Sequence, residues 1–242
     1  MNNIEIEKAA KNLRSRFPLF GHTIRMTAIK KLTADLSPNA IPYLVTAISS
    51  FDPEVSQAAL QSLRNIKDQQ SIDELSLIWF GGREKSIESI IASSKYVASK
   101  PMEIRVATAL KSGKTEHCDT SPSVEYLVKF LKDNDAAISQ NAIKTLRSLK
   151  DKEVIAFLCE SIINGKLEAA KAIAVEMNYL PAQVSRRCLF LVITGQIEKY
   201  FDLDYDFQYL RAEYQAAPDE LQKRIRAIIQ QSNDHRLMGL FG

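Results

Sequence analysis

The chain has few residues that end or bend a helix, and almost no stretch that alternates in the way of a β-strand. Glycine and proline each occur only eight times among 242 residues, mostly where helices are expected to begin or end. An apolar content of 45% and a charged content of 25% are typical of a folded protein, so we do not expect general disorder. These features together predict an all-α fold.

Long apolar segments are also missing. No run of about 18 apolar residues occurs, and residues 1–17 are charged throughout, without the apolar core of a secretory signal. Three cysteines are present, widely separated and without a C-x-x-C pair: Cys118, Cys159 and Cys188. An odd number of distant cysteines is typical of buried thiols in a reducing compartment rather than of a disulfide framework. We therefore expect a cytoplasmic protein that does not contact a membrane.

Catalytic motifs are missing as well. The sequence has no glycine-rich phosphate loop, no G-x-S-x-G and no H-E-x-x-H motif, and its histidines lie far apart, at His22, His117 and His235. His117 and Cys118 are neighbours, but adjacent loop residues point their side chains in different directions, so we do not expect a metal or nucleophile pair. We expect no cofactor and no small-molecule substrate, and an enzymatic role is not the favoured interpretation.

Four carboxylates near the C-terminus have the spacing of a calcium-binding loop: Asp202, Asp204, Asp206 and Glu213. The match fails at Phe207, which stands where such a loop needs glycine for its sharp turn. The favoured interpretation is an acidic cluster at the start of a helix that begins near Tyr205, where carboxylates complement the helix dipole. No metal site is predicted.

Aromatic residues concentrate in the same region, seven of them within 25 residues: Phe190, Tyr200, Phe201, Tyr205, Phe207, Tyr209 and Tyr214. Phe201, Tyr205 and Tyr209 are spaced four residues apart and would form one stripe on a helix. Such a stripe packs in a core or covers the end of a stack of helices. A tyrosine-rich surface with acids at its rim is also a common protein interface, so both interpretations stay open.

Residues 40–68 and 123–151 carry the same sequence pattern, identical at 11 of 29 positions without a gap. In both segments the apolar residues fall on one face of a 3.6-residue helix, before and after a turn at Phe51-Asp52 or at Asn134-Asp135. Each segment is therefore a pair of amphipathic helices, which cannot bury its apolar faces alone. It must stack on neighbouring helices.

Capping residues and prolines divide the chain into the following expected helices: 4–16, 23–35, 39–50, 53–66, 71–80, 83–98, 101–111, 122–132, 135–149, 152–164, 166–178, 181–194, 205–216 and 218–231. Between the two copies of the pattern, residues 69–121 hold three helices rather than two. There Gly81-Gly82 is expected to break one pair, and residues 113–121 form a polar loop. An irregular region in a stack of helix pairs is a common place for a binding feature.

The segment DPEVSQAALQSLRNIKDQQSIDEL resembles the second helix and following turn of a HEAT repeat. The resemblance covers residues 23–178 and implies a single domain over residues 1–242, a right-handed α-solenoid of about 12 to 14 helices in antiparallel pairs. Residues 179–242 would form a divergent C-terminal cap. Within that cap, residues 181–214 are faintly similar to a segment of some large bacterial WD-repeat proteins.

One departure from the HEAT pattern concerns the arginine that follows the valine and pairs with the turn aspartate of the adjacent repeat. Ser56 and Ser139 stand at that position in the two copies, and only Ile24-Arg25 keeps the arginine. Stacking is therefore expected to depend more on apolar packing than on a ladder of ion pairs.

The resemblance also implies a surface for a partner, because the second helices of successive HEAT repeats line the concave side of the stack. The expected partner-binding residues are Gln57, Gln61, Arg64, Arg83, Lys85, Gln140, Lys144 and Arg147. A second candidate surface is basic: residues 8–34 contain no acid, and Ile4, Leu13 and Phe17 would form the apolar side of the first helix. Its outward residues would be Lys8, Lys11, Arg14 and Arg16. This surface is either a solvated face or a contact for nucleic acid or an acidic protein.

These features favour a non-enzymatic adaptor that holds a protein partner on its concave face. The alternative is a nucleic-acid-binding protein, because alkylpurine DNA glycosylases are HEAT-like proteins of similar length. A net charge of only +3 speaks against a dedicated nucleic-acid binder.

Overall fold

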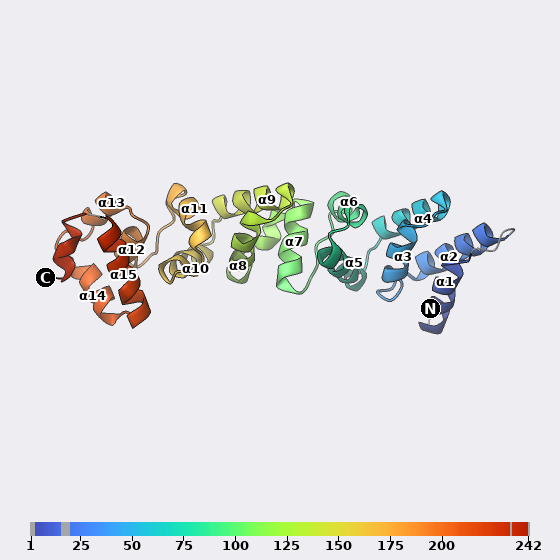
Figure 1. Cartoon of the computed structure of the whole chain (residues 1–242), viewed down its shortest axis with the longest axis horizontal. Helices are drawn as coiled ribbons and strands as arrows, with labels where there is room; N and C mark the ends of the chain where they lie inside the picture. Colours follow the sequence, from blue (N-terminus) through green and yellow to red (C-terminus); the bar gives the residue numbers. More distant parts are fainter. Residues whose placement is uncertain (1–2, 16–19, 233, 242) are drawn as a thin grey trace. The chain divides into compact units, whose positions relative to one another are not determined.

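The computed structural model describes residues 3–15, 20–232 and 234–241 (Figure 1). Within these ranges the secondary structure is helical and contains no strand, which confirms the predicted all-α class. Among the described helices, none is both long and apolar enough to cross a membrane. The α-helices are α1 (Asn3–Leu13), α2 (Gly21–Asp35), α3 (Ile41–Ile48), α4 (Pro53–Arg64), α5 (Gln69–Gly82), α6 (Lys85–Ser94), α7 (Met102–Ser112), α8 (Ser121–Lys129), α9 (Ala136–Arg147), α10 (Lys152–Ile163), α11 (Lys171–Glu176), α12 (Val184–Ile193), α13 (Ile197–Phe201), α14 (Gln208–Ala216) and α15 (Asp219–Ser232). Short 3₁₀ helices are η1 (Thr115–Cys118), η2 (Phe130–Lys132), η3 (Glu168–Ala170) and η4 (Leu237–Phe241).

The described residues form 15 α-helices, more than the 12 to 14 predicted, because the short helix α13 was not expected. Three helices do lie between residues 69 and 121, as predicted: α5, α6 and α7. The predicted break at Gly81-Gly82 is wrong, since both glycines belong to α5. That helix ends instead at Arg83, whose φ of 51° places it in the left-handed region.

The helices gather into two compact units. The first unit comprises the described residues up to Cys118 together with Asp133–Asn141. In it α1 packs on α2, α3 on α4 and α6 on α7, while α2, α3, α4 and α5 each also pack on the next helix but one. Their apolar faces meet in a core that includes the fully buried Leu44, Leu63 and Leu75.

The second unit comprises Asp119–Lys132 and the described residues from Ala142 onward. In it α10 packs on α8 and on α12, and α12 also packs on α13, α14 and α15. Phe190, Tyr200 and Ile225 are fully buried there. Helix α12 is therefore the centre of this unit's core.

The repetition seen in the sequence extends well beyond its 29 matched positions. Helices α4 and α9 begin and end 83 residues apart, and α5 and α10 begin at the same offset. Helix α12 is the second α-helix after α10, just as α7 is the second after α5. The short helices η1 and α13 begin 82 residues apart. We call residues 40–118 the first copy and residues 123–200 the second copy.

A left-handed residue followed by a tyrosine recurs at the same place in both copies. Lys95 and Asn178 have φ values of 54° and 53°. The buried Tyr96 hydroxyl donates to the carbonyls of Leu63 and Ile66, both at 3.1 Å. In the second copy, the Tyr179 hydroxyl donates to the carbonyls of Leu146 and Leu149 at 2.9 and 3.3 Å. Each tyrosine thus satisfies carbonyls at the C-terminal end of α4 or α9 that have no partner within the helix. We call each of these a tyrosine clamp.

The turn aspartates of the two copies are paired with cations from preceding helices. Arg25 of α2 donates to Asp52 at 2.6 Å, the contact that the HEAT resemblance implies for an arginine at this position, and the arginine side chain is only 7% exposed. Arg25 therefore does not face outward with the other N-terminal basic residues. Asp135 of the second copy is contacted at 2.6 Å by Lys111 of α7, which also contacts Glu88 at 2.5 Å. This lysine is a substitute for arginine that the sequence pattern did not predict.

The C-terminal aromatic residues do not form the predicted helical stripe. Helix α13 ends at Phe201 and α14 begins only at Gln208, so Tyr205 lies in the turn between them and is 81% exposed. Asp204 is buried in this turn and accepts hydrogen bonds from the amides of Tyr209 and Leu210, at 3.0 and 2.8 Å. This confirms the predicted role of a carboxylate at the start of the helix.

Candidate functional site

Helix α4 presents a polar stripe to solvent. Gln57, Gln61 and Arg64 are all exposed and lie four and three residues apart, which places them on one face of the helix. The opposite face is buried through Val55, Ala59 and Leu63. We call the three exposed residues the α4 stripe. Among the described residues, none forms an ion pair with Arg64.

The second copy has the same stripe on α9, formed by the exposed Gln140, Lys144 and Arg147. Here the arginine is engaged, because its guanidinium contacts the carboxylate of Glu176 at 2.8 Å. Both groups are about half exposed, so water screens this pair and it holds the arginine only weakly. The two stripes therefore share residue types and spacing, but only the first copy leaves its arginine without a carboxylate.

Arg83 and Lys85, the other two residues predicted to bind a partner, lie at the turn between α5 and α6. Arg83 contacts Asp133 at 3.3 Å and lies 4.8 Å from the ring centres of both Trp79 and Phe80. This side chain is committed to contacts within the protein. Lys85 is exposed at the first position of α6.

The N-terminal basic surface is only partly as predicted. Lys8, Lys11 and Arg14 are exposed, whereas Arg16 and Phe17 lie outside the described residues. The predicted apolar side of the helix is wrong at Ile4, which is 75% exposed. Helix α1 buries a different face, through Ile6 and Ala9. The first helical residues are therefore rotated relative to the predicted register.

Arg14 also lines a cavity of about 280 Å³ with Leu13, Tyr43, Phe51 and Val55. The walls of this cavity are mostly apolar, and it lies between α1 and the turn after α3.

The three thiols are buried, as predicted. Burial raises the pKa of the Cys118 and Cys159 thiols to about 12 and that of Cys188 to about 11, so all three are protonated at neutral pH. His117 lines a surface cavity whereas its neighbour Cys118 lies in the core, so the two do not form a nucleophile pair. Among the described residues, no group of three His, Cys, Asp or Glu side chains is placed to hold a metal ion.

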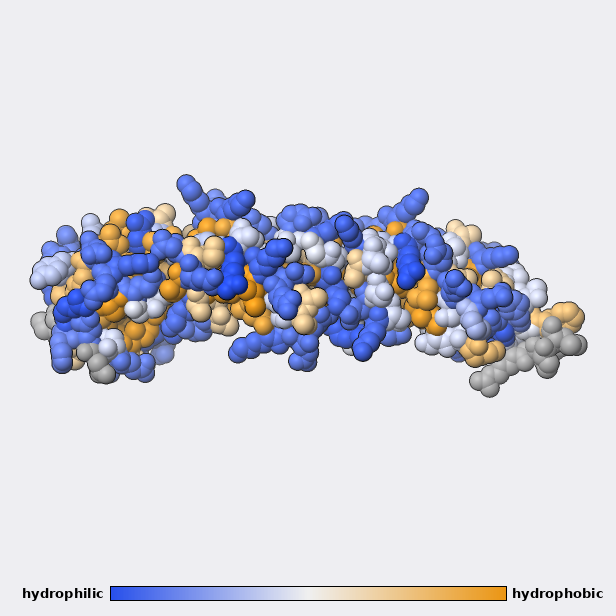
Figure 2. Space-filling model, turned by 90° about the horizontal axis from the view of Figure 1, so that it is seen from above, coloured by the Kyte–Doolittle hydropathy of each residue, from blue (hydrophilic) through white to orange (hydrophobic). Residues whose placement is uncertain are grey.

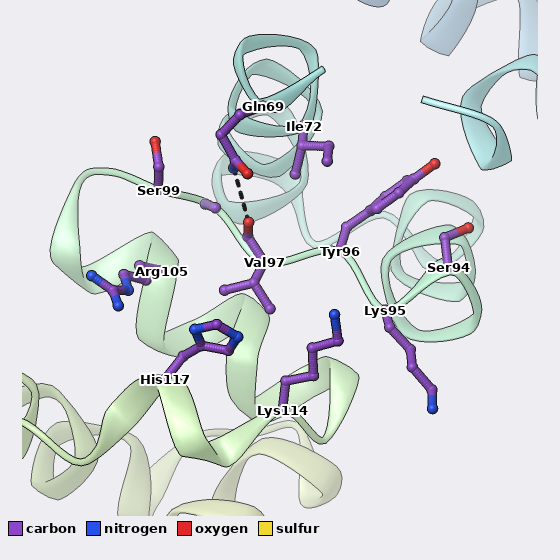
Figure 3. Close-up of a pocket in the computed structure, with 11 residues that line it drawn as sticks. Gln69, Ile72, Ser94, Lys95, Tyr96, Val97, Ser99, Arg105, Lys114 and His117 are labelled. Carbon is purple, nitrogen blue, oxygen red and sulfur yellow. Dashed lines mark hydrogen bonds between the residues drawn. The ribbon is translucent and has the colours of Figure 1, made fainter. Parts of the chain in front are cut away.

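The cavity at His117 is a site that the sequence did not reveal. It measures about 510 Å³ and lies in the irregular region between residues 69 and 121 (Figure 3). Helix α5, the segment after α6, helix α7 and η1 supply its walls. It is lined by Gln69, Ile72, Ser94, Lys95, Tyr96, Val97, Ala98, Ser99, Arg105, Lys114 and His117. We call it the basic cavity.

The segment that forms the upper wall of the basic cavity is held from three sides. The side-chain amide nitrogen of Gln69 donates to the backbone carbonyl of Val97 at 3.0 Å, the bond drawn in Figure 3. The backbone N–H of Ala98 donates to the hydroxyl of the buried Thr108 at 3.0 Å, and that of Ser99 donates to Asp73 at 2.6 Å. The wall is therefore fixed in the absence of any ligand.

The basic cavity adjoins the α4 stripe. Ser94, which lines the cavity, donates from its hydroxyl to the carbonyl of Arg64 at 3.4 Å, so the C-terminal ends of α4 and α6 lie side by side. The face drawn in Figure 2 is mostly hydrophilic, with smaller hydrophobic areas between the polar ones.

No protein-family model matches the chain, and no curated protein matches it either. Among solved structures, the chain is similar to the crystal structure of an engineered protein from the Northeast Structural Genomics Consortium. The two are 19% identical, over 96% of this chain and 97% of that one, with a TM-score of 0.28. A TM-score this low carries no argument about fold or function.

Proposed function

We propose that the protein is a non-enzymatic adaptor, which binds a protein partner through the α4 stripe and the corresponding residues of α9. The repetition of these residues supports the proposal. Gln57 and Gln140, and likewise Arg64 and Arg147, are identical pairs at exposed positions, where packing does not require a particular side chain. Matching exposed residues on matching helices are what a repeated contact with one partner needs.

We propose further that the chain is a right-handed HEAT-like α-solenoid, one domain over residues 1–242 with residues 179–242 as its cap. The packing of consecutive and alternate helices within the first unit supports this, because stacked helix pairs make those contacts. In such a stack α4 and α9 would line the concave face. The protein would act in the cytoplasm without a cofactor, a membrane or a small-molecule substrate.

Capture of partners by the native protein, followed by nuclease treatment, is the first experiment. The second measures the affinity of a captured protein for the double variant Arg64→Glu with Arg147→Glu. We expect weaker binding by roughly tenfold or more, because each reversal removes an attraction and adds a repulsion. The matched control is Lys67→Glu with Lys150→Glu, which makes the same charge change at exposed positions of both copies. If the stripe variant and the wild type bind with equal affinity at the same salt concentration, these stripes are not the docking surface.

The second candidate function is nucleic-acid binding, which the exposed Lys8, Lys11 and Arg14 favour. A glycosylase role needs an aromatic side chain that can stack on a base, and Trp79 is fully buried in α5. Reversing the three N-terminal charges together should weaken nucleic-acid binding and flatten its dependence on salt, since each lost phosphate contact removes roughly one released counterion. Under the adaptor proposal, the same variant binds its protein partner normally.

A further inference from the structure

We infer that the basic cavity binds a phosphate monoester group. Its floor carries four basic side chains in a row, Arg105, His117, Lys114 and Lys95, which come from η1, α7 and the ends of α6 and α7 (Figure 3). In this view Lys114 and His117 point toward Val97, whereas the side chains of Arg105 and Lys95 extend outward on either side. None of the described residues that line the cavity is an aspartate or a glutamate. The inference stands apart from the adaptor proposal, because it rests on different residues.

Two carboxylates beside these walls contact other residues of the protein. Asp73 accepts hydrogen bonds from the backbone and the hydroxyl of Ser99, and from Gln69 at 2.9 Å. Glu116 lies 3.9 Å from the imidazole of His117, at the limit of an ion pair. Neither acid is placed to neutralise the lysines and the arginine of the cavity.

The cavity's cations differ from three other cations of the first unit in their pairing. Arg25, Arg83 and Lys111 each contact an aspartate. By contrast, among the described residues none forms a hydrogen bond or ion pair with the side chain of Lys95, Arg105 or Lys114. Lys95 is exposed, but Arg105 and Lys114 are only partly exposed, so water does not fully solvate the charges of these two residues. Grouping partly buried like charges is unfavourable unless an anion is present.

The second copy supplies an internal comparison for this cavity. The helix before it ends in the same way in both copies: the N–H of Lys114 bonds to the carbonyl of Ala109 at 2.9 Å, and that of Gln196 bonds to the carbonyl of Leu191 at 2.8 Å. Gln196 is therefore the equivalent of Lys114. By the same alignment the equivalents of Lys95, Arg105 and His117 are Asn178, Arg187 and Lys199.

In the second copy these equivalent residues all have hydrogen-bond partners. The Lys199 ammonium donates to the side-chain oxygens of Asn178 at 3.0 Å and of Gln196 at 2.9 Å. The Arg187 guanidinium donates to the carbonyls of Pro181 and Ala182, at 3.1 and 3.2 Å. The shared scaffold thus folds without a lysine at position 95 or 114. The two lysines of the first copy are not required for the fold, and their unpaired charges remain for a ligand.

A phosphate monoester fits the number and type of these groups. Its dianion has three strongly accepting oxygens, which suit an arginine fork and two lysine ammonium groups that approach from different directions. A volume of about 510 Å³ lies within the range of small-ligand pockets. The ester has two possible sources, a free small molecule or a phosphoserine in a protein segment, and both present the same charged group.

The test is calorimetric titration of the full chain with glycerol 3-phosphate and with a short peptide that carries one phosphoserine. The diagnostic variant is Lys95→Asn with Lys114→Gln, which installs the residues of the second copy and so keeps the fold. We expect its affinity to fall by roughly tenfold or more for whichever ester binds, since two charge-assisted hydrogen bonds are lost. Arg105→Gln is a second variant with the same expected direction.

The control is Lys67→Asn with Lys150→Gln, which removes two exposed charges outside the cavity and should change affinity by less than about twofold. Tighter binding of the peptide identifies a phosphoserine as the source, and equal or tighter binding of glycerol 3-phosphate identifies a free ester. Three results would overturn the inference: no binding of either probe, an equal loss in the control variant, or equal affinity for a peptide with glutamate in place of phosphoserine.

Discussion

Among the described residues, none forms a hydrogen bond or ion pair with the side chain of Lys95 or Lys114 in the first copy, whereas the equivalent Asn178 and Gln196 of the second copy both bind the ammonium of Lys199. The backbone around these residues is nevertheless the same. Lys95 and Asn178 share the left-handed conformation, and a tyrosine clamp follows each. Comparison of the two copies therefore distinguishes the interactions that the fold requires from the surface side chains that can vary.

The comparison shows which interactions belong to the scaffold. The tyrosine clamps and the paired turn aspartates recur, although the cation at the turn changes from Arg25 to Lys111. The charges of Lys95 and Lys114 do not recur, because Asn178 and Gln196 stand at the equivalent positions, so folding does not explain them. The predictions below test how closely the two scaffolds match.

The largest effect is expected at the matching core leucines. Leu63→Ala and Leu146→Ala each remove a fully buried side chain and should each lower the free energy of unfolding by about 2 to 5 kcal/mol. Denaturant unfolding of the two variants measures this. If either substitution leaves the unfolding midpoint unchanged, the two copies do not share one core register.

The next effect concerns the turn aspartates and pH. Hydrogen bonds from Arg25 and then from His22 lower the pKa of Asp52 to about 2, against an ordinary value of 3.8. The folded state therefore prefers the carboxylate, so this contribution is present above about pH 4 and is lost as the pH falls toward 2. Asp52→Asn should cost roughly 1.5 to 3 kcal/mol at pH 7 and flatten this part of the stability profile.

Asp135, the turn aspartate of the second copy, allows the same test of pH-dependent stability. Burial alone would raise its pKa, but the hydrogen bond and charge of Lys111 and the amides of Ile138 and Ala137 outweigh burial and lower it. Asp135→Asn should therefore also lower stability at neutral pH and reduce the loss in acid. A profile of either variant that follows the wild type from pH 5 to pH 2 would show that its ion pair does not stabilise the fold.

A smaller effect is expected at the tyrosine clamps. Tyr96→Phe and Tyr179→Phe keep the ring but remove a hydroxyl that donates to two helix-end carbonyls, so each should cost on the order of 1 kcal/mol. Unfolding measured at neutral pH gives both values. Costs that differ by more than about 1 kcal/mol would mean that the clamps are alike in geometry but not in energy.

The smallest effect separates the two stripe arginines. Arg147→Ala removes a half-exposed pair with Glu176 and should cost at most about 1 kcal/mol, whereas Arg64→Ala should change stability by less. A double-mutant cycle with Glu176→Ala isolates the pair. A coupling energy indistinguishable from zero would make Arg147 as free as Arg64 to contact a partner.

The helical class and the turns at Phe51 and Asn134 could be predicted because they depend on local periodicity. The tyrosine clamp was also within reach, since Tyr96 and Tyr179 stand 83 residues apart, the offset of the repeat itself. The matched segments, residues 40–68 and 123–151, end before these two tyrosines. The break predicted at Gly81-Gly82 failed because both glycines stay in α5, and Arg83 takes the left-handed conformation that ends the helix.

The basic cavity could not be predicted in the same way. Its residues come from segments that alternate between helix and loop, and no periodicity relates Lys95 to Arg105 or Lys114. Likewise, the burial of Arg25 and the engagement of Arg83 depend on aspartates 27 and 50 residues away. Whether such distant residues come into contact depends on tertiary packing, which the periodicity of the sequence does not describe.

The tyrosine clamps have a consequence for the stripes beside them. The last turn of a helix usually frays, but the hydroxyl of Tyr96 fastens the carbonyls of Leu63 and Ile66, the two buried residues on either side of Arg64 in the chain. Arg64 is therefore presented from backbone that is already ordered. Binding of a partner there does not carry the entropy cost of ordering a loose helix end. More of the free energy of each contact therefore contributes to affinity.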